Sequence, residues 1–430
     1  FHHVKFFLVL RRHHVIAVIA TRSTGMQLNQ ISAGFISIDC GIPEGKTHVD
    51  PATGIVYSSD EGYVGTGENG IVSSGFSNAA PYGDLRSFPH GARNCYALQP
   101  VRPGKKYLVR AGFLYGNYDR LDRPPVFDLY LGVNQWASVN TSFPTYSPLL
   151  LEIIAVATAG SIEVCLVNTR SGTPFMSLLE LRPIPDTLHP LVSTSQSLVL
   201  FKERKDPGEK HGLLRYPNDT YDRLWFPTGN RPEWTAISTE LPVTNREHGD
   251  PFETPPAVMM TAITATSGDT LNFTLAARME DDELYVFMHF AELERHAGNE
   301  TREFDVYLNG ELWRRAISPE YLVAYHMWDL TPWKVSTLDF SLRATSKSTL
   351  PPILNGLEVY SLKRLTVFPT DPRDGRNWIG DPCSPANLMW DGINCSYESP
   401  PRITSLSLAS SGLSGPIPSC LSNLTAIKIL

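Results

Sequence analysis

The pattern of apolar and polar positions along this chain occurs twice. Residues 127–136 alternate between the two classes, with Phe127, Leu129 and Leu131 on one face, and residues 304–313 repeat the alternation with Phe304, Val306 and Leu308. A period of two is typical of a strand that buries one face. The second copy begins 304 − 127 = 177 positions after the first. Each copy runs into a turn, Gly132–Asn134 or Asn309-Gly310, and Asn-Gly is a strong hairpin signal.

The surroundings of the two strands repeat as well. An apolar run at 107–113 precedes the first copy and a similar run at 285–290 precedes the second. Downstream, Glu180 in one copy corresponds to Glu358 in the other, an offset of 358 − 180 = 178. A nearly constant offset predicts a tandem duplication, and its length indicates two whole domains rather than the turns of a solenoid.

Composition favours turns and strands over long helices. The chain has 430 residues, 34 Pro and 31 Gly, with 42% hydrophobic and 19% charged residues. A chain of this length needs more than one core. We therefore expect an all-β protein with two tandem β-sandwich modules, residues 34–185 and 198–362, joined by a linker at 186–197.

The character of the sequence changes after Leu362. Cys383 and Cys395 lie 395 − 383 = 12 positions apart around a Trp, which suits a small disulfide-closed cap within a segment spanning 363–400. Residues 403–424 fit the spacing of a leucine-rich repeat, with Ser411 where Asn is usual. A single repeat cannot bury its own face, so residues 401–430 are expected to be a truncated repeat region.

The two ends of the chain lead to expectations about targeting. Residues 1–30 hold two apolar runs split by the charged stretch 11–14, which fits a degraded signal peptide and equally a disordered, artefactual leader. The longest apolar run elsewhere, 149–157, contains Glu152 and is far shorter than the roughly 20 residues that span a bilayer. A membrane anchor would therefore have to lie beyond Leu430.

Charge and cysteine usage point outside the cell. The net charge of −7 with a pI near 6.0 gives no electrostatic footprint for nucleic acid. The chain has six cysteines and six Asn-x-Ser/Thr sequons, which favour a secreted glycoprotein. The sequon asparagines are Asn140, Asn218, Asn272, Asn299, Asn394 and Asn423. The pairing of Cys40, Cys95, Cys165 and Cys420 stays open.

Catalytic and metal motifs are weak. The Gly-rich stretch 65–70 has neither a preceding strand nor a following helix for a phosphate site, so we interpret it as a loop. His289 and His296 are seven positions apart, which is not the spacing of a zincin pair. There is no serine nucleophile elbow. We expect no catalytic residue, metal or cofactor, although a carboxylate pair for glycoside hydrolysis depends on a spatial separation that a sequence does not show.

A recognition site is easier to place. Tyr115, Tyr118 and Asp119 follow the 107–113 strand on an expected loop, and the corresponding loop of the second copy offers mainly charge. Tyrosine rings can stack on sugars while polar groups bind the hydroxyls. These three residues are our candidate ligand-binding residues. The alternative is that both tyrosines pack on the sandwich edge or against the sister module.

Several ordered motifs resemble a known family. These are Gly34–Gly41, Arg93–Tyr96, Phe127–Gly132, Val164–Phe175 and Gly380–Cys383 with Trp390–Gly392. Together they resemble the ectodomain of plant malectin-like leucine-rich-repeat receptor-like kinases, over nearly everything after Gly34. The resemblance implies two malectin-like sandwiches, a cysteine-capped repeat region and, in complete members, a transmembrane helix and a cytoplasmic kinase.

The chain also departs from that family. It has no kinase motifs, so no kinase activity can reside in it, and the helix that relatives usually carry before the cap is missing. Animal malectin carries a Tyr-Phe pair near the candidate loop, where this chain has Asn117 and Tyr118.

The resemblance implies an extracellular recognition module on the outer side of the plasma membrane. Its ligand would be a cell-wall glycan or an apoplastic peptide, bound with or without a co-receptor. The alternatives are a secreted glycan-active enzyme and a non-signalling cell-wall binding protein.

Overall fold

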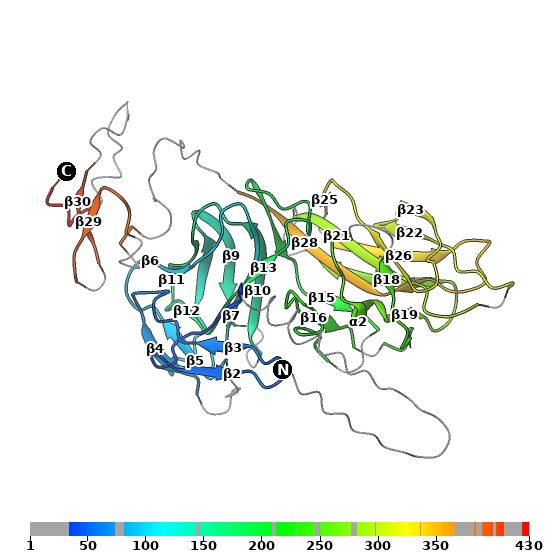
Figure 1. The fold of residues 1–430 in the computed structure, drawn as a ribbon, viewed down its shortest axis with the longest axis horizontal. Helices are drawn as coiled ribbons and strands as arrows, with labels where there is room; N and C mark the ends of the chain where they lie inside the picture. The colour runs from blue at the N-terminus through cyan, green and yellow to red at the C-terminus, as the bar shows by residue number, and fades with distance from the viewer. Residues whose placement is uncertain are drawn as a thin grey trace, which may run out of the picture.

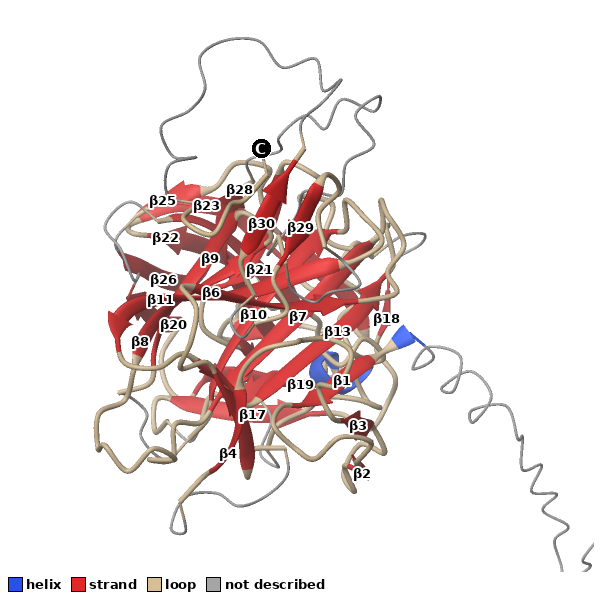
Figure 2. Cartoon of the chain, turned by 90° about the vertical axis from the view of Figure 1, so that its left-hand side faces the viewer, coloured by secondary structure: helices blue, strands red, loops and turns tan. Residues whose placement is uncertain are grey.

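The computed structural model describes residues 34–73, 81–142, 147–208, 212–229, 231–245, 250–276, 282–296, 298–335, 337–365, 382–383, 389–398, 401–407 and 424–429. Strands make up nearly all of the regular structure in these residues (Figure 2). They contain one α-helix, the single turn α2 (Pro256–Met259). The expectation of an all-β protein is confirmed.

The largest sheet has 14 strands and contains strands from both copies of the repeat. Its main path runs in the order β18 (Thr244–Asn245), β24 (Val323–Met327), β21 (Glu283–Phe290), β28 (Gly356–Arg364), β14 (Gln196–Leu200), β10 (Leu149–Val156), β7 (Lys106–Phe113), β13 (Leu178–Ile184), β1 (Ile36–Asp39), β3 (Val56–Ser58) and β2 (Thr47–Val49). Beside this path lie β15 (Arg204–Asp206), β16 (Trp225–Pro227) and β25 (Trp333–Lys334).

Smaller sheets form the other layers. Two four-stranded sheets consist of β6 (Arg93–Leu98), β11 (Ile162–Ser171), β8 (Val126–Leu131) and β9 (Asn134–Asn140), and of β20 (Thr270–Ala276), β26 (Thr337–Ala344), β22 (Phe304–Leu308) and β23 (Glu311–Ile317). Two three-stranded sheets consist of β12 (Phe175–Met176), β5 (Asp84–Ser87) and β4 (Glu68–Ile71), and of β27 (Ile353–Leu354), β19 (Thr261–Ala265) and β17 (Trp234–Ser238).

The order of the strands repeats along the chain. We call β1 to β13 unit 1 and β14 to β28 unit 2; they are the blue-to-cyan and the green-to-orange lobes of Figure 1. In the large sheet, β10-β7-β13-β1 of unit 1 corresponds to β24-β21-β28-β14 of unit 2. The four-stranded order β6-β11-β8-β9 corresponds to β20-β26-β22-β23, and the three-stranded sheets correspond likewise. In each four-stranded sheet, the strand with the alternating pattern, β8 or β22, is followed in the chain by its hairpin partner, β9 or β23.

Each unit has its own core between its sheets. Phe127 and Leu129 of β8 are fully buried, as are Phe304, Val306 and Leu308 of β22, so the alternation indicated the correct buried faces. The hairpin between β22 and β23 turns at Asn309 and Gly310, both with positive φ (52° and 81°). That conformation is what an Asn-Gly turn supplies.

The two units share one continuous sheet. β14, the first strand of unit 2, pairs with β28 as β1 pairs with β13, and its other edge pairs with β10 of unit 1. Ile153 lies opposite Val199 and Ile154 opposite Leu198. β14 begins at Gln196, inside the segment that the sequence analysis assigned to a linker.

The cap region is a separate two-stranded sheet of β29 (Ile393–Cys395) and β30 (Ile403–Leu406). The structure forms the disulfide expected between Cys383 and Cys395. β30 lies where the strand of the leucine-rich repeat is expected, while most of that repeat, Cys420 and Asn423 lie outside the described residues. A second disulfide joins Cys95 to Cys165, and Cys40 is buried without one.

Candidate ligand-binding site at the junction of the units

The structure brings Tyr115, Tyr118 and Asp119 together, but the rings of the two tyrosines point into the unit 1 core. Tyr115 is 5% exposed, and its hydroxyl donates to Asp119 while accepting from the backbone N–H of Arg123 at 3.2 Å. Burial and the bond to Asp119 raise the pKa of Tyr115 to about 12. Tyr118 packs on Phe175, with ring centroids 5.6 Å apart. Both tyrosines therefore pack on the edge of the sandwich, as in the alternative given in the sequence analysis.

These residues fix the shape of their loop. Asn117, Arg120 and Asp122 have positive φ values of 50°, 59° and 51°, a conformation that non-glycine residues adopt only at a cost. The side-chain amide of Asn117 donates to the carboxylate of Asp122 and accepts from the backbone N–H of Asp122, and Asp119 accepts from the N–H of Leu121. The exposed part of the loop is its tip, residues 120–123, which carries Leu121 between two arginines.

The junction of the units carries a buried network of charges. Arg110 of β7 lies between Glu152 of β10 and Glu180 of β13, which face it directly across the sheet. Its Nε lies 2.6 Å from Glu152, and its Nη1 pairs with Glu180. All three side chains are at most 3% exposed. Because buried charges need partners, the three residues stabilise one another only as a set.

A segment of unit 2 supplies the rest of the network over unit 1. Asp222 accepts from Arg182 at 2.8 Å and from Arg215 at 2.7 Å. Burial alone would raise the pKa of Glu180, but Arg182, Arg110 and Arg215 outweigh it and hold that pKa at about 2. The carboxylates of this network are therefore ionised acceptors.

Arg204 connects the two units. Its Nη1 pairs with Glu152 of unit 1, and its Nε lies 3.0 Å from Glu358 of unit 2. Its guanidinium also lies 5.5 Å from the ring centroid of Tyr360. Glu358 occupies the position in β28 that Glu180 occupies in β13, so the duplicated glutamates are both partners of buried arginines.

A cleft lies over this junction. It has a volume of about 750 Å³ and takes side chains from both units. Its lining includes Leu149 and Leu150 of unit 1 and Leu213, Phe226 and Lys205 of unit 2. Arg110, Glu152 and Glu180 also line it. A mainly apolar hollow with a few fixed polar groups is the usual form of a ligand site.

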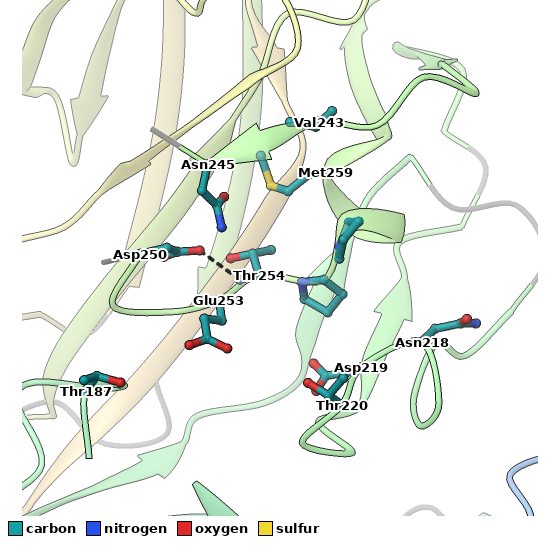
Figure 3. A pocket seen from close by; sticks show the side chains of 12 residues that line it. Thr187, Asn218, Asp219, Thr220, Val243, Asn245, Asp250, Glu253, Thr254 and Met259 are labelled. Carbon is teal, nitrogen blue, oxygen red and sulfur yellow. Dashed lines mark hydrogen bonds between the residues drawn. The ribbon is translucent and has the colours of Figure 1, made fainter. Parts of the chain in front are cut away.

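A second hollow, of about 780 Å³, lies in unit 2 beside α2 (Figure 3). Asp219, Asp250 and Glu253 line it, and among its described lining residues there is no Lys or Arg. Asp250 accepts from the backbone N–H of Thr254 at 3.2 Å (Figure 3). Asn218, one of the predicted glycosylation sites, lies on the lining of this hollow, so a glycan there would compete with a ligand.

A chain of close polar contacts leads from this hollow to the junction. Asp250 lies 3.2 Å from His326, the Nδ1 atoms of His326 and His289 are 2.7 Å apart, and His289 lies 3.2 Å from Glu358. Between the two Nδ1 atoms one must donate and the other accept. Burial lowers the pKa of His289. His289 therefore belongs to this relay and not to the His289–His296 pair considered from sequence; no group of three metal-ligating side chains occurs in the described part of the chain.

Comparison with known proteins fits this architecture. Residues 38–362 match the malectin-like domain. The chain belongs to the malectin-like family. One leucine-rich-repeat receptor-like serine/threonine-protein kinase of Arabidopsis thaliana is 42% identical over 422 residues, covering 93% of this chain and 48% of that protein. Another, MEE39 from the same plant, is 38% identical over 424 residues, covering 93% and 47%. This malectin-like chain thus spans about half the length of the curated relatives it matches.

Solved structures share the fold of this malectin-like chain. The ANX2 ectodomain from Arabidopsis thaliana has a TM-score of 0.65 at 15% identity, covering 77% of this chain and 97% of its own. The plant receptor-like kinase FER has a TM-score of 0.62 at 17% identity, covering 76% and 96%. FER has also been solved in complex with the peptide RALF23 and LLG2. None of the helices in the described residues has the length and apolar character needed to cross a membrane.

The junction residues were not identified as a site from sequence, although a signal was present. Arg110, Glu152, Glu180 and Glu358 are charged residues in the middle of otherwise apolar strands. A charge at a position that the strand pattern buries requires a partner of opposite charge. Three of these positions lie in the adjacent strands β10, β7 and β13, and Glu358 lies in β28, which β14 separates from β10. The sequence does not show which strands are neighbours.

Proposed function

We propose that this chain is the extracellular ligand-recognition part of a receptor-like kinase and that it binds a peptide in the cleft at the junction of its units. The observation that carries the proposal is the cleft itself, since a ligand there would contact both units over a floor held by the charge network. Receptor kinases among the relatives, and the FER complex with a peptide among the structural neighbours, support this function.

The lining of the cleft favours a peptide with apolar side chains. Leucines from both units lie beside Lys202, Lys205 and Glu203 at the rim. Apolar anchors surrounded by a charged rim are typical of peptide and protein recognition. A co-receptor would then bind the complex of chain and peptide, by analogy with LLG2 beside FER.

The cleft chemistry argues against the glycan-active enzyme. A glycosidase needs one carboxyl group that holds a proton near neutral pH. Burial raises the pKa of Glu152 and Glu180, but their arginine partners lower it by more than burial raises it. Both carboxyl groups therefore stay ionised. A kinase reaction is not expected from a chain that matches only the malectin-like half of its relatives. We infer a binding function and no enzymatic one.

The remaining sequence expectations become part of this proposal. We infer two duplicated modules at 34–185 and 198–362, a linker and cysteine cap at 363–400, and a repeat region at 401–430. Extracellular location is supported by the two disulfides and by the exposure of Asn140, Asn218, Asn272, Asn299 and Asn394. We propose that Tyr115, Tyr118 and Asp119 contribute to recognition by holding the loop tip at 120–123 in place.

The cleft can be tested with one substitution and a matched control. Leu213 in the cleft is 47% exposed, and Leu241, outside the hollows described here, is 49% exposed. Leu213→Arg places a charge among apolar side chains, so the affinity for a peptide bound there should fall at least about tenfold. Leu241→Arg should leave the affinity unchanged.

The measurement is biolayer interferometry of the secreted full chain against panels of secreted plant peptides and cell-wall oligosaccharides. Equal peptide binding by wild type and Leu213→Arg would contradict the cleft. Oligosaccharide binding that survives Leu213→Arg and is lost in Tyr118→Ala would instead favour sugar recognition by the 115–123 loop.

A further inference from the structure

Among the described residues, no strand or backbone partner lies on the outer edge of β20 in unit 2. β20 is the terminal strand of the order β20-β26-β22-β23. The N–H of Ala344 donates to the carbonyl of Asp269 at 2.8 Å, at the start of the same ladder that pairs Thr270 with Arg343. Because bonded and non-bonded positions alternate in an antiparallel ladder, Asn272 and Thr274 direct their N–H and C=O groups away from β26.

The corresponding edge in unit 1 is closed by the chain itself. β6 holds the place of β20 in the order β6-β11-β8-β9. Ala97, 177 positions before Thr274, donates its backbone N–H to the carbonyl of Tyr63 at 2.8 Å. Tyr63 and Val64 pack against the unit 1 core. Unit 1 therefore shows that a loop segment with apolar side chains can bond to this edge of the fold and cover it.

In unit 2 a pocket takes the place of that segment. It has a volume of about 420 Å³, and its lining includes residues 272–275 of β20 together with Thr228, Arg231 and Trp234. The indole N–H of Trp234 has no hydrogen-bond partner among the described residues. The charged residues of its described lining, Lys205 and Arg231, are both basic.

We propose that the free edge of β20 binds an extended segment of a partner protein as an added strand. An apolar side chain of that segment fills the pocket against Trp234, as Tyr63 fills the equivalent place in unit 1. An acidic residue of the segment faces Arg231 and Lys205. Addition of a strand to a sheet edge supplies affinity through backbone bonds and specificity through the adjacent pocket. This site is distinct from peptide binding at the junction cleft, although Lys205, Leu275 and Leu357 line both hollows.

The sequon at Asn272 leaves the edge of the sheet open, although Asn272 also lines the pocket. Side chains leave a sheet perpendicular to its plane, whereas an added strand lies within that plane. Asn272 and Thr274 are exposed, and Phe273 between them packs on Phe340 in the core, with ring centroids 4.8 Å apart. A glycan on Asn272 would therefore extend from the outer face and leave the edge accessible.

The test uses a random-peptide phage library selected on the immobilised, secreted full chain. Recovered peptides are resynthesised and measured against wild type and Thr274→Pro. Proline removes the outward N–H of Thr274, so affinity should fall about tenfold or more. The control is Thr47→Pro in β2, another terminal strand, where the bond from Ser59 N–H to the Lys46 carbonyl places the Thr47 N–H on the free side.

A second readout changes the peptide and leaves the protein intact. N-methylation of alternate peptide residues that face β20 should abolish binding, while methylation of the residues between them should have little effect. Trp234→Ala should weaken the same peptides. Recovery only of peptides that bind Thr274→Pro and Trp234→Ala as well as wild type would overturn the proposal, as would recovery of none. Peptides sensitive to Leu213→Arg but not to Thr274→Pro would support the cleft and contradict the edge.

Discussion

Arg204 is a single buried side chain with ion pairs to both units. It is fully buried and contacts Glu152 of one unit and Glu358 of the other. Removing one member of a buried ion network leaves the charges of its partners buried and unpaired. The free-energy cost of this is usually larger than the stability that the whole network provides compared with apolar residues in its place. The free energy of unfolding should therefore depend strongly on this arginine.

We expect Arg204→Met, which keeps most of the volume, to lower the free energy of unfolding by about 3–5 kcal/mol. The control is Lys205→Met, since Lys205 makes a solvent-exposed pair with Glu203 and should change stability by less than about 1 kcal/mol. Urea unfolding followed by tryptophan fluorescence measures both. An Arg204→Met variant as stable as its control would show that the network contributes nothing to the junction.

At the residue scale the sequence predicted the chemistry of side chains better than their contacts. Tyr115 and Asp119 were predicted to contact a ligand, and in the structure they bond to each other. The direction in which these side chains point could not be predicted from the sequence. Strand alternation ends at Phe113, and a loop with three positive φ values has no periodicity from which side-chain directions can be inferred. For the same reason the partner of Cys95 could not be chosen, since the pairing depends on β6 lying beside β11.

The β6–β11 ladder carries a disulfide that its duplicate, β20–β26, does not have. Cys95 lies opposite Cys165 in unit 1, and Asn272 lies opposite Ser341 in unit 2. The disulfide thus reinforces a ladder that unit 2 holds by hydrogen bonds alone. It closes a sequence separation of 70 residues, against 12 for Cys383–Cys395.

Replacing both Cys95 and Cys165 with Ala should lower the free energy of unfolding by about 2–5 kcal/mol, because the unfolded chain regains the freedom of a long loop. Cys40→Ala is the matched control, as Cys40 is a buried cysteine outside a disulfide. Calorimetry of the secreted proteins gives the comparison. If the double variant lost no more stability than Cys40→Ala, the covalent link would not be what stabilises this ladder.

At the element scale, periodicity predicted the strands and their buried faces, and the repeat predicted that the set occurs twice. Neither pattern predicted that β14 pairs with the edge of β10. The segment 186–197 is rich in Pro, Ser and Thr, which indicates a linker. Only the pairing of Gln196 and Ser197 with β28 shows that unit 2 begins within it. Contacts between edges of different units depend on tertiary packing and leave no local pattern.

At the scale of the whole molecule, the junction joins the units by a shared sheet, a charge network and an apolar cluster. The cluster includes Leu108 and Ile154 of unit 1 and Phe252, Phe287 and Tyr360 of unit 2. A ligand in the junction cleft would contact a surface whose two halves are held in fixed register. Loss of this interface should therefore affect both units together.

The last prediction concerns the acid stability of that interface. His189 is buried beside Phe252 and Tyr360, and neither of its ring nitrogens has a hydrogen-bond partner among the described residues. Burial lowers the pKa of His189 from 6.5 to about 3, a shift that Glu358 only partly opposes. Between these values the unfolded chain binds a proton that the folded chain does not, so stability rises with pH and falls on acidification.

His189→Asn removes this titration. Relative to wild type, the variant should gain up to about 1.4 kcal/mol per pH unit as the pH falls from 6.5 toward 3. Below about pH 4.5 both proteins should also lose stability, because the pKa of Glu180, held at about 2 by its arginines after the opposing effect of burial, lies below its usual value of 4.5. Thermal melts at matched ionic strength across pH 3–7 measure the difference. A difference that stays constant over this range would mean that His189 is charged, or solvated, in the folded junction.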